Sequence, residues 1–122
     1  MTLRCLIVDD NERFLGAARA SLDGDKLEIV GTATTSEQAL RSVEELRPEV
    51  VLVDIGLGKE SGFDLARTLV GRYPWLGSSV VLISTRAEDD YADMIEGSPA
   101  VGFITKTKLS ARAIHKLVRS SA

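Results

Sequence analysis

Five short apolar runs, each followed by a segment with helical periodicity, constrain the fold of this chain more than any other feature. The runs span residues 3–8, 27–30, 50–53, 80–83 and 101–104, and they are rich in valine and isoleucine. Runs this short and this rich in β-branched residues favour strands over helices. Four of them are nearly continuous rather than alternating, which is typical of parallel strands covered on both faces.

The segments between the runs carry apolar residues at the three- and four-residue spacing of one helix face. A clear stripe follows the third run and contains Leu65 and Leu69. The weakest predicted helix is residues 88–96, where Tyr91 and Ile95 are the only clear apolar pair. Alternating strands and helices predict right-handed crossovers and a parallel sheet with helices on both faces. We therefore expect an α/β, flavodoxin-like (βα)5 doubly wound parallel sheet with strand order 2-1-3-4-5.

Capping patterns agree with two of the predicted helix starts. Thr35 and Gln38 have the spacing of a capping box. Ser110 is the predicted N-cap of the last helix, with Leu109 and Ile114 spaced as a hydrophobic staple.

Length, charge and cysteine content exclude several classes of function. The 122 residues fit one domain of ordinary size, and we expect residues 1–122 to form it. A formal net charge of −3 argues against nucleic acid binding by this domain. Cys5 is the only cysteine, which excludes an internal disulfide, and we expect it in the core. No apolar run approaches the ~20 residues of a membrane span, so we expect a cytoplasmic protein without a membrane partner.

Acidic, hydroxyl and basic side chains follow the predicted strands at their carboxyl ends. Asp9 and Asp10 follow the first strand, Asp54 the third, Ser84 the fourth and Lys106 the fifth. Ligands of open α/β sheets bind at this edge, so we expect these side chains to converge there.

The predicted convergence limits the chemistry of the site. Close carboxylates repel one another, so they must share protons or bind a cation. Oxygen ligands without a nearby histidine or cysteine select a hard ion, Mg²⁺ or Mn²⁺. A metal ion beside a hydroxyl and an ammonium group is the set of groups that phosphoryl transfer uses.

Four segments of the chain resemble the receiver domains of bacterial two-component response regulators. They are LIVDDNE, VVLVDIGLGKESG, VVLIST and VGFITK, and the resemblance covers essentially the whole chain. Each motif is weak alone, but their order is specific, with Ser84, Phe103 and Lys106 at the family's intervals. The sequence resembles receivers whose regulators carry a helix-turn-helix output. We expect a stand-alone receiver or the receiver part of such a regulator.

The resemblance implies a role for each residue at the predicted metal site. Asp54 is expected to be the phosphoacceptor, which takes a phosphoryl group from the phosphohistidine of a sensor histidine kinase or phosphotransfer protein. Asp10 is expected to bind the metal directly and Asp9 largely through a bound water. The backbone carbonyl of Gly56 is expected to complete the protein ligands.

The resemblance also implies how the domain responds. Ser84 and Lys106 are expected to contact phosphoryl oxygens, and Phe103 to turn inward as the Ser84 hydroxyl moves to the phosphate. The output is then a changed surface on the fourth helix, fifth strand and fifth helix. Such a domain assists its own phosphorylation and dephosphorylation and is not an enzyme with an external product.

Two features of this sequence are expected to modulate that chemistry. Gly56, Gly58 and Gly62 leave the loop after the third strand unusually free of side-chain constraints. Arg86 lies two residues beyond Ser84, where the family controls the access of water to the acyl phosphate. Its guanidinium either pairs with the phosphate and slows hydrolysis or lies in solvent, and both interpretations stay open.

Opposite charges on the last two helices suggest a dimer. Residues 88–96 are strongly acidic, and a self-complementary patch is what a two-fold interface needs. In this family such charges can pair across a homodimer formed through helix 4, strand 5 and helix 5. The basic residues of the patch are Lys108, Arg112, Lys116 and Arg119.

Two other classes of function remain open. The first is a pseudo-receiver that binds partners without phosphorylation, although the complete set of acidic, hydroxyl and lysine residues argues against it. The second is a flavodoxin-like enzyme or cofactor binder, but residues 9–12 are acidic where such proteins carry a glycine-rich phosphate loop. A Mg²⁺ titration would separate these classes if the fluorescence of Trp75 reports on the site. We expect Trp75 to cover an edge of the sheet and His115 to have a surface or packing role.

Overall fold

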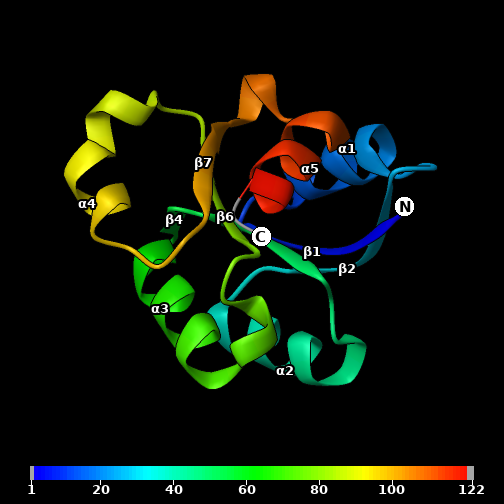
Figure 1. The fold of residues 1–122 in the computed structure, drawn as a ribbon, viewed down its shortest axis with the longest axis horizontal. Coiled ribbons are helices and arrows are strands. Elements are labelled where there is room, and N and C mark those ends of the chain that lie inside the picture. The colour runs from blue at the N-terminus through cyan, green and yellow to red at the C-terminus, as the bar shows by residue number, and fades with distance from the viewer. Residues whose placement is uncertain (1, 121–122) are drawn as a thin grey trace.

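The five apolar runs form one parallel sheet with the order β2-β1-β3-β6-β7 (Figure 1). The computed structural model describes residues 2–120, and the side chains of Arg119 and Ser120 lie outside that description. β4 and β5 belong to a separate hairpin, so β6 and β7 are the fourth and fifth strands of this sheet. The predicted strand order 2-1-3-4-5 is therefore confirmed. The strands are β1 (Leu3–Val8), β2 (Leu27–Ala33), β3 (Val50–Asp54), β6 (Val80–Ser84) and β7 (Gly102–Thr105).

Helices cover both faces of the sheet, which explains the continuous apolar runs. Figure 1 shows α1 and α5 on one face and α2 and α3 on the other. Side chains alternate between these faces, so Leu6 and Val8 pack toward α2 and α3 while Cys5 and Ile7 pack toward α1. All four side chains are fully buried, and burial raises the pKa of the Cys5 thiol. The helices are α1 (Glu12–Leu22), α2 (Ser36–Leu46), α3 (Gly62–Arg72), α4 (Ala92–Glu96) and α5 (Ala111–Ser120).

Both predicted caps are present, and one differs in detail. Thr35 Oγ1 accepts the N–H of Gln38 at 3.1 Å. Gln38 Oε1 reaches back to the N–H and hydroxyl of Thr34, at 2.9 and 3.0 Å, one residue before the expected N-cap amide. Ser110 Oγ accepts the N–H of Ala113 at 3.0 Å.

The loop after β3 contains a hairpin that the sequence pattern does not predict. β4 (Gly56–Leu57) and β5 (Glu60–Ser61) pair antiparallel. Gly58 makes the turn possible, because its φ of 65° is a conformation that residues with a side chain rarely adopt. Two-residue strands are too short to show an alternating pattern, so hydrophobic periodicity gives no signal for them.

The predicted fourth helix over residues 88–96 is present only in part as an α-helix. The segment is a 3₁₀ turn, η2 (Glu88–Tyr91), followed by the five residues of α4. Neither part has a side-chain N-cap, and Tyr91 and Ile95 are only half-buried against the core. An acidic segment with two apolar contacts has little to hold it in a longer helix.

The described part of the chain contains no helix long and apolar enough to cross a membrane.

Candidate functional site

The carboxyl edge of the sheet brings the predicted acidic residues together. Asp9 directly follows β1 and Asp54 is the last residue of β3, and these strands pair in parallel with Val8 opposite Val53. One carboxylate oxygen from each of Asp9, Asp10 and Asp54 lies within 4.8 Å of the other two. Three negative charges at this spacing require a counter-charge.

Lys106, which directly follows β7, supplies part of that counter-charge. Its Nζ lies 2.5 Å from Asp9 Oδ2 and donates to Asp54 Oδ2 at 3.2 Å. The exposed fractions of the three side chains are 11% for Lys106, 0% for Asp9 and 12% for Asp54. One buried cation therefore faces two buried carboxylates, which leaves the site with excess negative charge.

Burial and this excess charge together shift the pKa values of Asp54 and Lys106. Burial, followed by the charge of Asp9, raises the pKa of Asp54 to about 6, although Lys106 opposes the shift. Burial alone would lower the pKa of Lys106, but its contacts with Asp9 and Asp54 outweigh burial and raise that pKa. Lys106 is therefore charged at neutral pH, and the ionised form of Asp54 is unusually basic for a carboxylate.

The two adjacent acids of the site differ in their surroundings. Asp9 is fully buried, and its Oδ1 accepts the N–H of Asn11 at 2.9 Å. Its Oδ2 has the Lys106 ion pair but no hydrogen bond of good geometry among the described residues. Asp10 is exposed, and a Cβ placed on Gly58 would lie 3.4 Å from its Oδ2. A cluster of carboxylate oxygens with only one lysine among the described residues as counter-charge fits a hard divalent cation.

The loop that follows Asp54 is held close to that residue. The N–H of Gly56 donates to Asp54 Oδ1 at 3.2 Å, and the N–H of Gly62 donates to the Ile55 carbonyl at 2.7 Å. A Cβ on Gly62 would lie 2.0 Å from the backbone oxygen of Asp54, so only glycine allows α3 to begin there. Glu60 Oε1 also accepts the N–H of Ser36 at 3.0 Å, which ties the hairpin to the first turn of α2.

Ser84 and Phe103 lie on the two strands beyond β3. Ser84 is buried at the end of β6, and its Oγ accepts the N–H of Arg86 at 3.1 Å. The Arg86 side chain is exposed and forms no ion pair with the described residues. Phe103 on β7 is half-buried against the core that contains Phe63, and it lines a hollow of about 420 Å³ with residues 87–89.

Sequence reasoning missed one contact of the site. The ring of Phe14, in the first turn of α1, has its centroid 4.1 Å from Lys106 Nζ. Asn11, the N-cap of α1, accepts the N–H of Phe14 at 3.1 Å. Asn11 is a residue type that favours the N-cap, so the sequence could have placed Phe14 in the first turn of a helix beside the site. Nothing in the sequence pairs Phe14 with Lys106, which lies 92 positions later.

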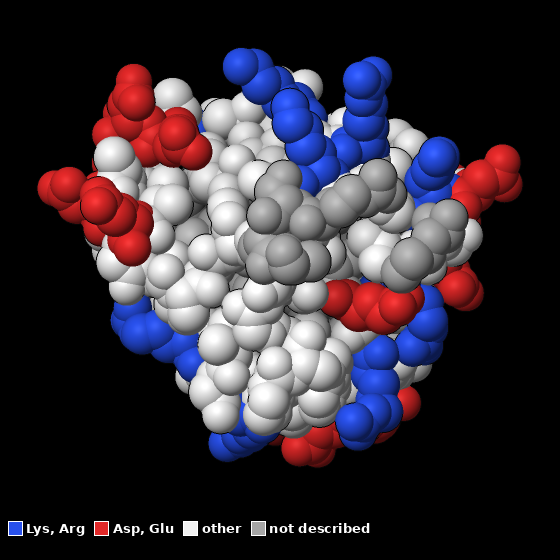
Figure 2. All heavy atoms as spheres, viewed as in Figure 1, with Lys and Arg blue, Asp and Glu red and all other residues white. Residues whose placement is uncertain are grey.

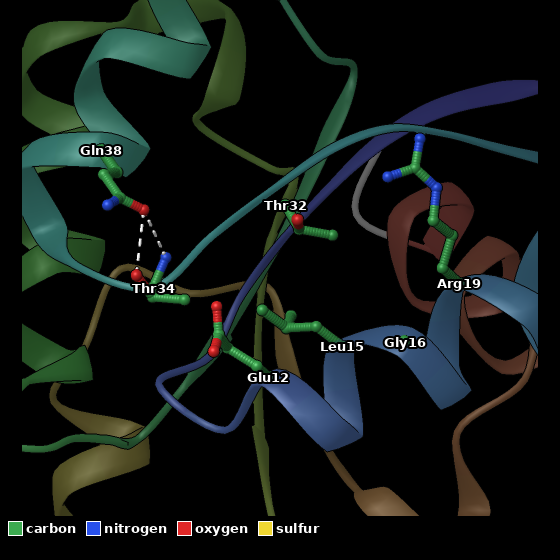
Figure 3. A pocket seen from close by; sticks show the side chains of 7 residues that line it. All are labelled: Glu12, Leu15, Gly16, Arg19, Thr32, Thr34 and Gln38. Carbon is green, nitrogen blue, oxygen red and sulfur yellow. Dashed lines mark hydrogen bonds between the residues drawn. The ribbon is translucent and has the colours of Figure 1, made fainter.

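A second hollow, of about 330 Å³, lies between α1 and the end of β2 together with the start of α2 (Figure 3). Its charged residues, Glu12 and Arg19, are about two turns apart on α1. Figure 3 shows the Gln38 side chain turned toward Thr34, to which it is hydrogen-bonded. No predicted site residue lines this hollow, whose lining is Glu12, Leu15, Gly16, Arg19, Thr32, Thr34 and Gln38.

Trp75 and His115 lie outside the acidic site. Trp75 belongs to η1 (Pro74–Leu76), which precedes β6 at the opposite, amino edge of the sheet. Its Nε1–H donates to the Pro48 carbonyl at 3.1 Å, so its fluorescence is not a local reporter of the acidic site. His115 Nε2–H donates to the Lys26 carbonyl at 2.6 Å and joins α5 to the start of β2.

Comparison with known proteins agrees with this geometry. Response regulator GacA from Pseudomonas viridiflava is 32% identical over 105 residues, which are 85% of this chain and 48% of the relative. Transcriptional regulatory protein KdpE from Mycobacterium tuberculosis is 34% identical over 106 residues, which are 87% of this chain and 45% of that relative. The chain thus spans about half the length of the curated relatives it matches.

A solved structure and a family profile cover almost all of the chain. The response regulator domain of CheB from Thermotoga maritima superposes on this chain with a TM-score of 0.78 and is 23% identical in sequence. The superposition includes 98% of this chain and 96% of the CheB domain, which supports the fold. The sequence model of the response regulator receiver domain family matches residues 5–119. This chain therefore belongs to the response regulator receiver domain family.

Proposed function

We propose that this domain is a phosphoacceptor switch that receives a phosphoryl group on Asp54. The observation that carries the proposal is the contact of one buried lysine with two buried carboxylates at the carboxyl edge of the sheet. The phosphoryl donor is the phosphohistidine of a sensor histidine kinase or a phosphotransfer protein, in keeping with the family. The domain acts in signalling and releases no external product.

The transfer step uses the carboxylate of Asp54 as the nucleophile. One of its oxygens attacks phosphorus and the P–N bond of phosphohistidine breaks, with its electron pair going to the ring nitrogen. The other ring nitrogen already carries a proton, so the imidazole leaves as neutral histidine. The high pKa of Asp54 supports this role, because a more basic carboxylate oxygen is a better nucleophile once ionised.

Two side chains bind the transferred group. The ammonium of Lys106 turns one of its N–H groups from the carboxylates to a phosphoryl oxygen. Ser84 accepts the backbone N–H of Arg86, which leaves its hydroxyl proton to donate to another phosphoryl oxygen.

The acidic cluster is the proposed metal site. Asp9, Asp10 and Asp54, with the backbone carbonyl of Gly56, would hold Mg²⁺ or Mn²⁺, and Asp9 would do so largely through water. When bound, the ion supplies positive charge against the phosphoryl oxygens. The spacing of the three carboxylates, with Lys106 as their only partner cation among the described residues, supports this assignment.

Arg86 and Gly56 are the proposed modulators of the phosphate lifetime. The exposed guanidinium of Arg86 is two residues from Ser84 and has no competing ion pair in the described part of the chain. Arg86→Ala is expected to change the rate of acyl-phosphate decay by about threefold, as loss of one exposed charge contact would. A decay rate equal to that of the wild type, measured by intact mass over time, would remove Arg86 from the mechanism.

Phosphorylation switches the surface of α4, β7 and α5. The Ser84 hydroxyl moves toward the phosphate and Phe103 turns inward behind it, which is a population shift between two states. The half-buried state of Phe103 and the hollow beside it support a second position for the ring.

The same surface is the proposed homodimer interface. Figure 2 shows acidic side chains gathered over the region of α4 and basic side chains over η3 (Lys106–Lys108) and α5. Glu88, Asp93 and Arg112 are exposed members of these two groups, whereas the side chain of Arg119 lies outside the described residues. Light scattering with and without beryllofluoride tests the dimer, and a monomer in both conditions at high concentration contradicts it.

The phosphoacceptor role is tested by incubating the protein with acetyl phosphate and Mg²⁺ and measuring intact mass. The wild type is expected to gain one phosphoryl group and Asp54→Asn none. Equal uptake by the variant would show that Asp54 is not the sole acceptor. Binding of Mg²⁺ by calorimetry without any phosphate uptake would favour a phosphorylation-independent interaction module.

A further inference from the structure

We propose that Phe14 is a positioning residue, which holds the ammonium group of Lys106 at the phosphoacceptor site through the face of its ring. The inference rests on the proposed function, since it concerns the lysine that binds the transferred phosphoryl group. The distance of 4.1 Å between the ring centroid and Nζ lies well within the range of a cation–π contact.

The first turn of α1 fixes the ring in place. Asn11 caps this helix by accepting the N–H of Phe14 at 3.1 Å. The N–H of Asn11 in turn donates to Asp9 Oδ1 at 2.9 Å. Phe14 is half-buried and packs against the core cluster on the α1 face of the sheet. The same short segment therefore orients both Asp9 and the ring that contacts Lys106.

The ring contact matters because carboxylates alone would hold the N–H groups of Lys106 and leave them less free to bind a phosphoryl oxygen. The ammonium has three N–H donors on a flexible four-carbon stem. Its 2.5 Å contact with Asp9 competes with any new phosphoryl oxygen. A ring face attracts the cation without accepting a directed hydrogen bond, so the N–H groups can turn toward a new acceptor while the ammonium stays in place.

The ring also limits hydration of the ammonium. The Lys106 side chain is 11% exposed, with carboxylates on one side and Phe14 on another. Without the ring, water replaces the aromatic face and the cation gains alternative positions. The predicted consequence is a slower transfer step rather than weaker binding of the phosphoryl donor.

Phe14→Leu tests this inference, because leucine fills part of the space but has no aromatic face. With acetyl phosphate and Mg²⁺, the rate at saturating donor is expected to fall roughly threefold to tenfold, with an unchanged half-saturating concentration. Phe14→Tyr and Phe14→Trp are expected to retain the wild-type rate. Leu22→Val, on the same helix and in the same cluster, is the matched control and is expected to leave the rate unchanged. Melting temperatures of all variants show whether each is folded.

A double-mutant cycle separates positioning from packing. Phe14→Leu is expected to weaken beryllofluoride binding in the wild-type background and to have no effect in the Lys106→Met background. In the NMR spectrum, the Cε protons of Lys106 are expected to be shifted upfield by the ring in the wild type and to lose that shift in Phe14→Leu. Equal weakening in both backgrounds, or unshifted Cε protons in the wild type, would overturn the inference.

The two proposals fail in distinguishable ways. A wild-type chain that takes no phosphoryl group on Asp54 overturns the proposed function. A wild-type chain that is phosphorylated, with Phe14→Leu reacting at the same rate, overturns the role of Phe14 alone.

Discussion

The two edges of the sheet each place a cation on an aromatic ring, but in different surroundings. At the carboxyl edge, Lys106 Nζ lies 4.1 Å from the Phe14 ring centroid. At the amino edge, the guanidinium carbon of Arg47 lies 4.3 Å from the ring centroid of Trp75. The contacts are nearly the same length, so the contact alone does not distinguish a functional site from a structural one.

The difference lies in what surrounds each cation. Lys106 faces two buried carboxylates whose charges exceed its own. Arg47 and Trp75 are both exposed, with 39% exposure at the tryptophan. Next to them, Tyr73 packs its ring 5.2 Å from Trp75 and donates its hydroxyl to Glu44 at 3.0 Å. The amino edge is a set of locally satisfied contacts, whereas the carboxyl edge keeps buried negative charge in excess.

Removing the cation from the carboxyl edge is expected to have the largest effect on stability. Lys106→Met leaves Asp9 and Asp54 buried without a counter-charge, so the free energy of unfolding without Mg²⁺ is expected to fall by about 2–4 kcal/mol. Urea denaturation at pH 7.5 followed by circular dichroism measures this change, and added Mg²⁺ should restore part of it. Lys108→Met, at an exposed position two residues on, is the control, with a change within about 0.5 kcal/mol. Equal losses of unfolding free energy in Lys106→Met and Lys108→Met would contradict the view that the carboxyl edge depends on its buried counter-charge.

Removing a charge from the acidic cluster is expected to have a smaller effect of opposite sign. The pKa of Asp54 is raised to about 6, so the fold favours its protonated form and ionisation destabilises the fold as pH rises through 6. Asp54→Asn without Mg²⁺ is therefore expected to raise the free energy of unfolding at pH 7.5 by about 1–3 kcal/mol. The gain should shrink below pH 6 and vanish near pH 4.

Thermal unfolding from pH 4 to 8 in EDTA measures this dependence on pH. Asp25→Asn, at an exposed carboxylate, is the control and should show no such trend. A loss of stability in Asp54→Asn at pH 7.5 would mean that the carboxylate is favourably paired rather than crowded.

A substitution at the amino edge is expected to change stability least. Arg47 adopts a left-handed backbone conformation with φ of 47°, which glycine would tolerate without strain. Arg47→Gly loses a contact with Trp75 and relieves that strain, so the free energy of unfolding should change by about 1 kcal/mol or less. The rate of phosphorylation by acetyl phosphate should stay within about twofold of the wild type. A larger change in rate would reveal coupling between the two edges.

The sheet and its acidic edge were predictable because both depend on local signals. β-branched runs identify the strands, and the residue that ends each strand is carried to one edge by parallel pairing. The tandem Asp9 and Asp10 show the limit of this reasoning, because the sequence does not say which of them is buried. In the structure Asp9 is fully buried and Asp10 is exposed.

The remaining features depend on contacts between distant residues or on very short elements. The Phe14 ring meets Lys106 only because the first turn of α1 and the residue after β7 both lie at the carboxyl edge of the sheet. The hairpin of β4 and β5 is fixed by the turn at Gly58 and by Glu60, whose partner Ser36 is 24 positions away. Periodicity over a window of residues contains none of this information.

The hydrogen bond between Glu60 and Ser36 has a consequence for anyone who builds chimeric receivers. The hairpin after Asp54 and the start of α2 are joined in space although they are separate in the chain. Grafting residues 56–61 from another receiver would leave the Ser36 amide without its acceptor unless residues 34–38 are grafted too. The two segments should therefore be exchanged together, because a swap of either loop alone separates two hydrogen-bonded partners.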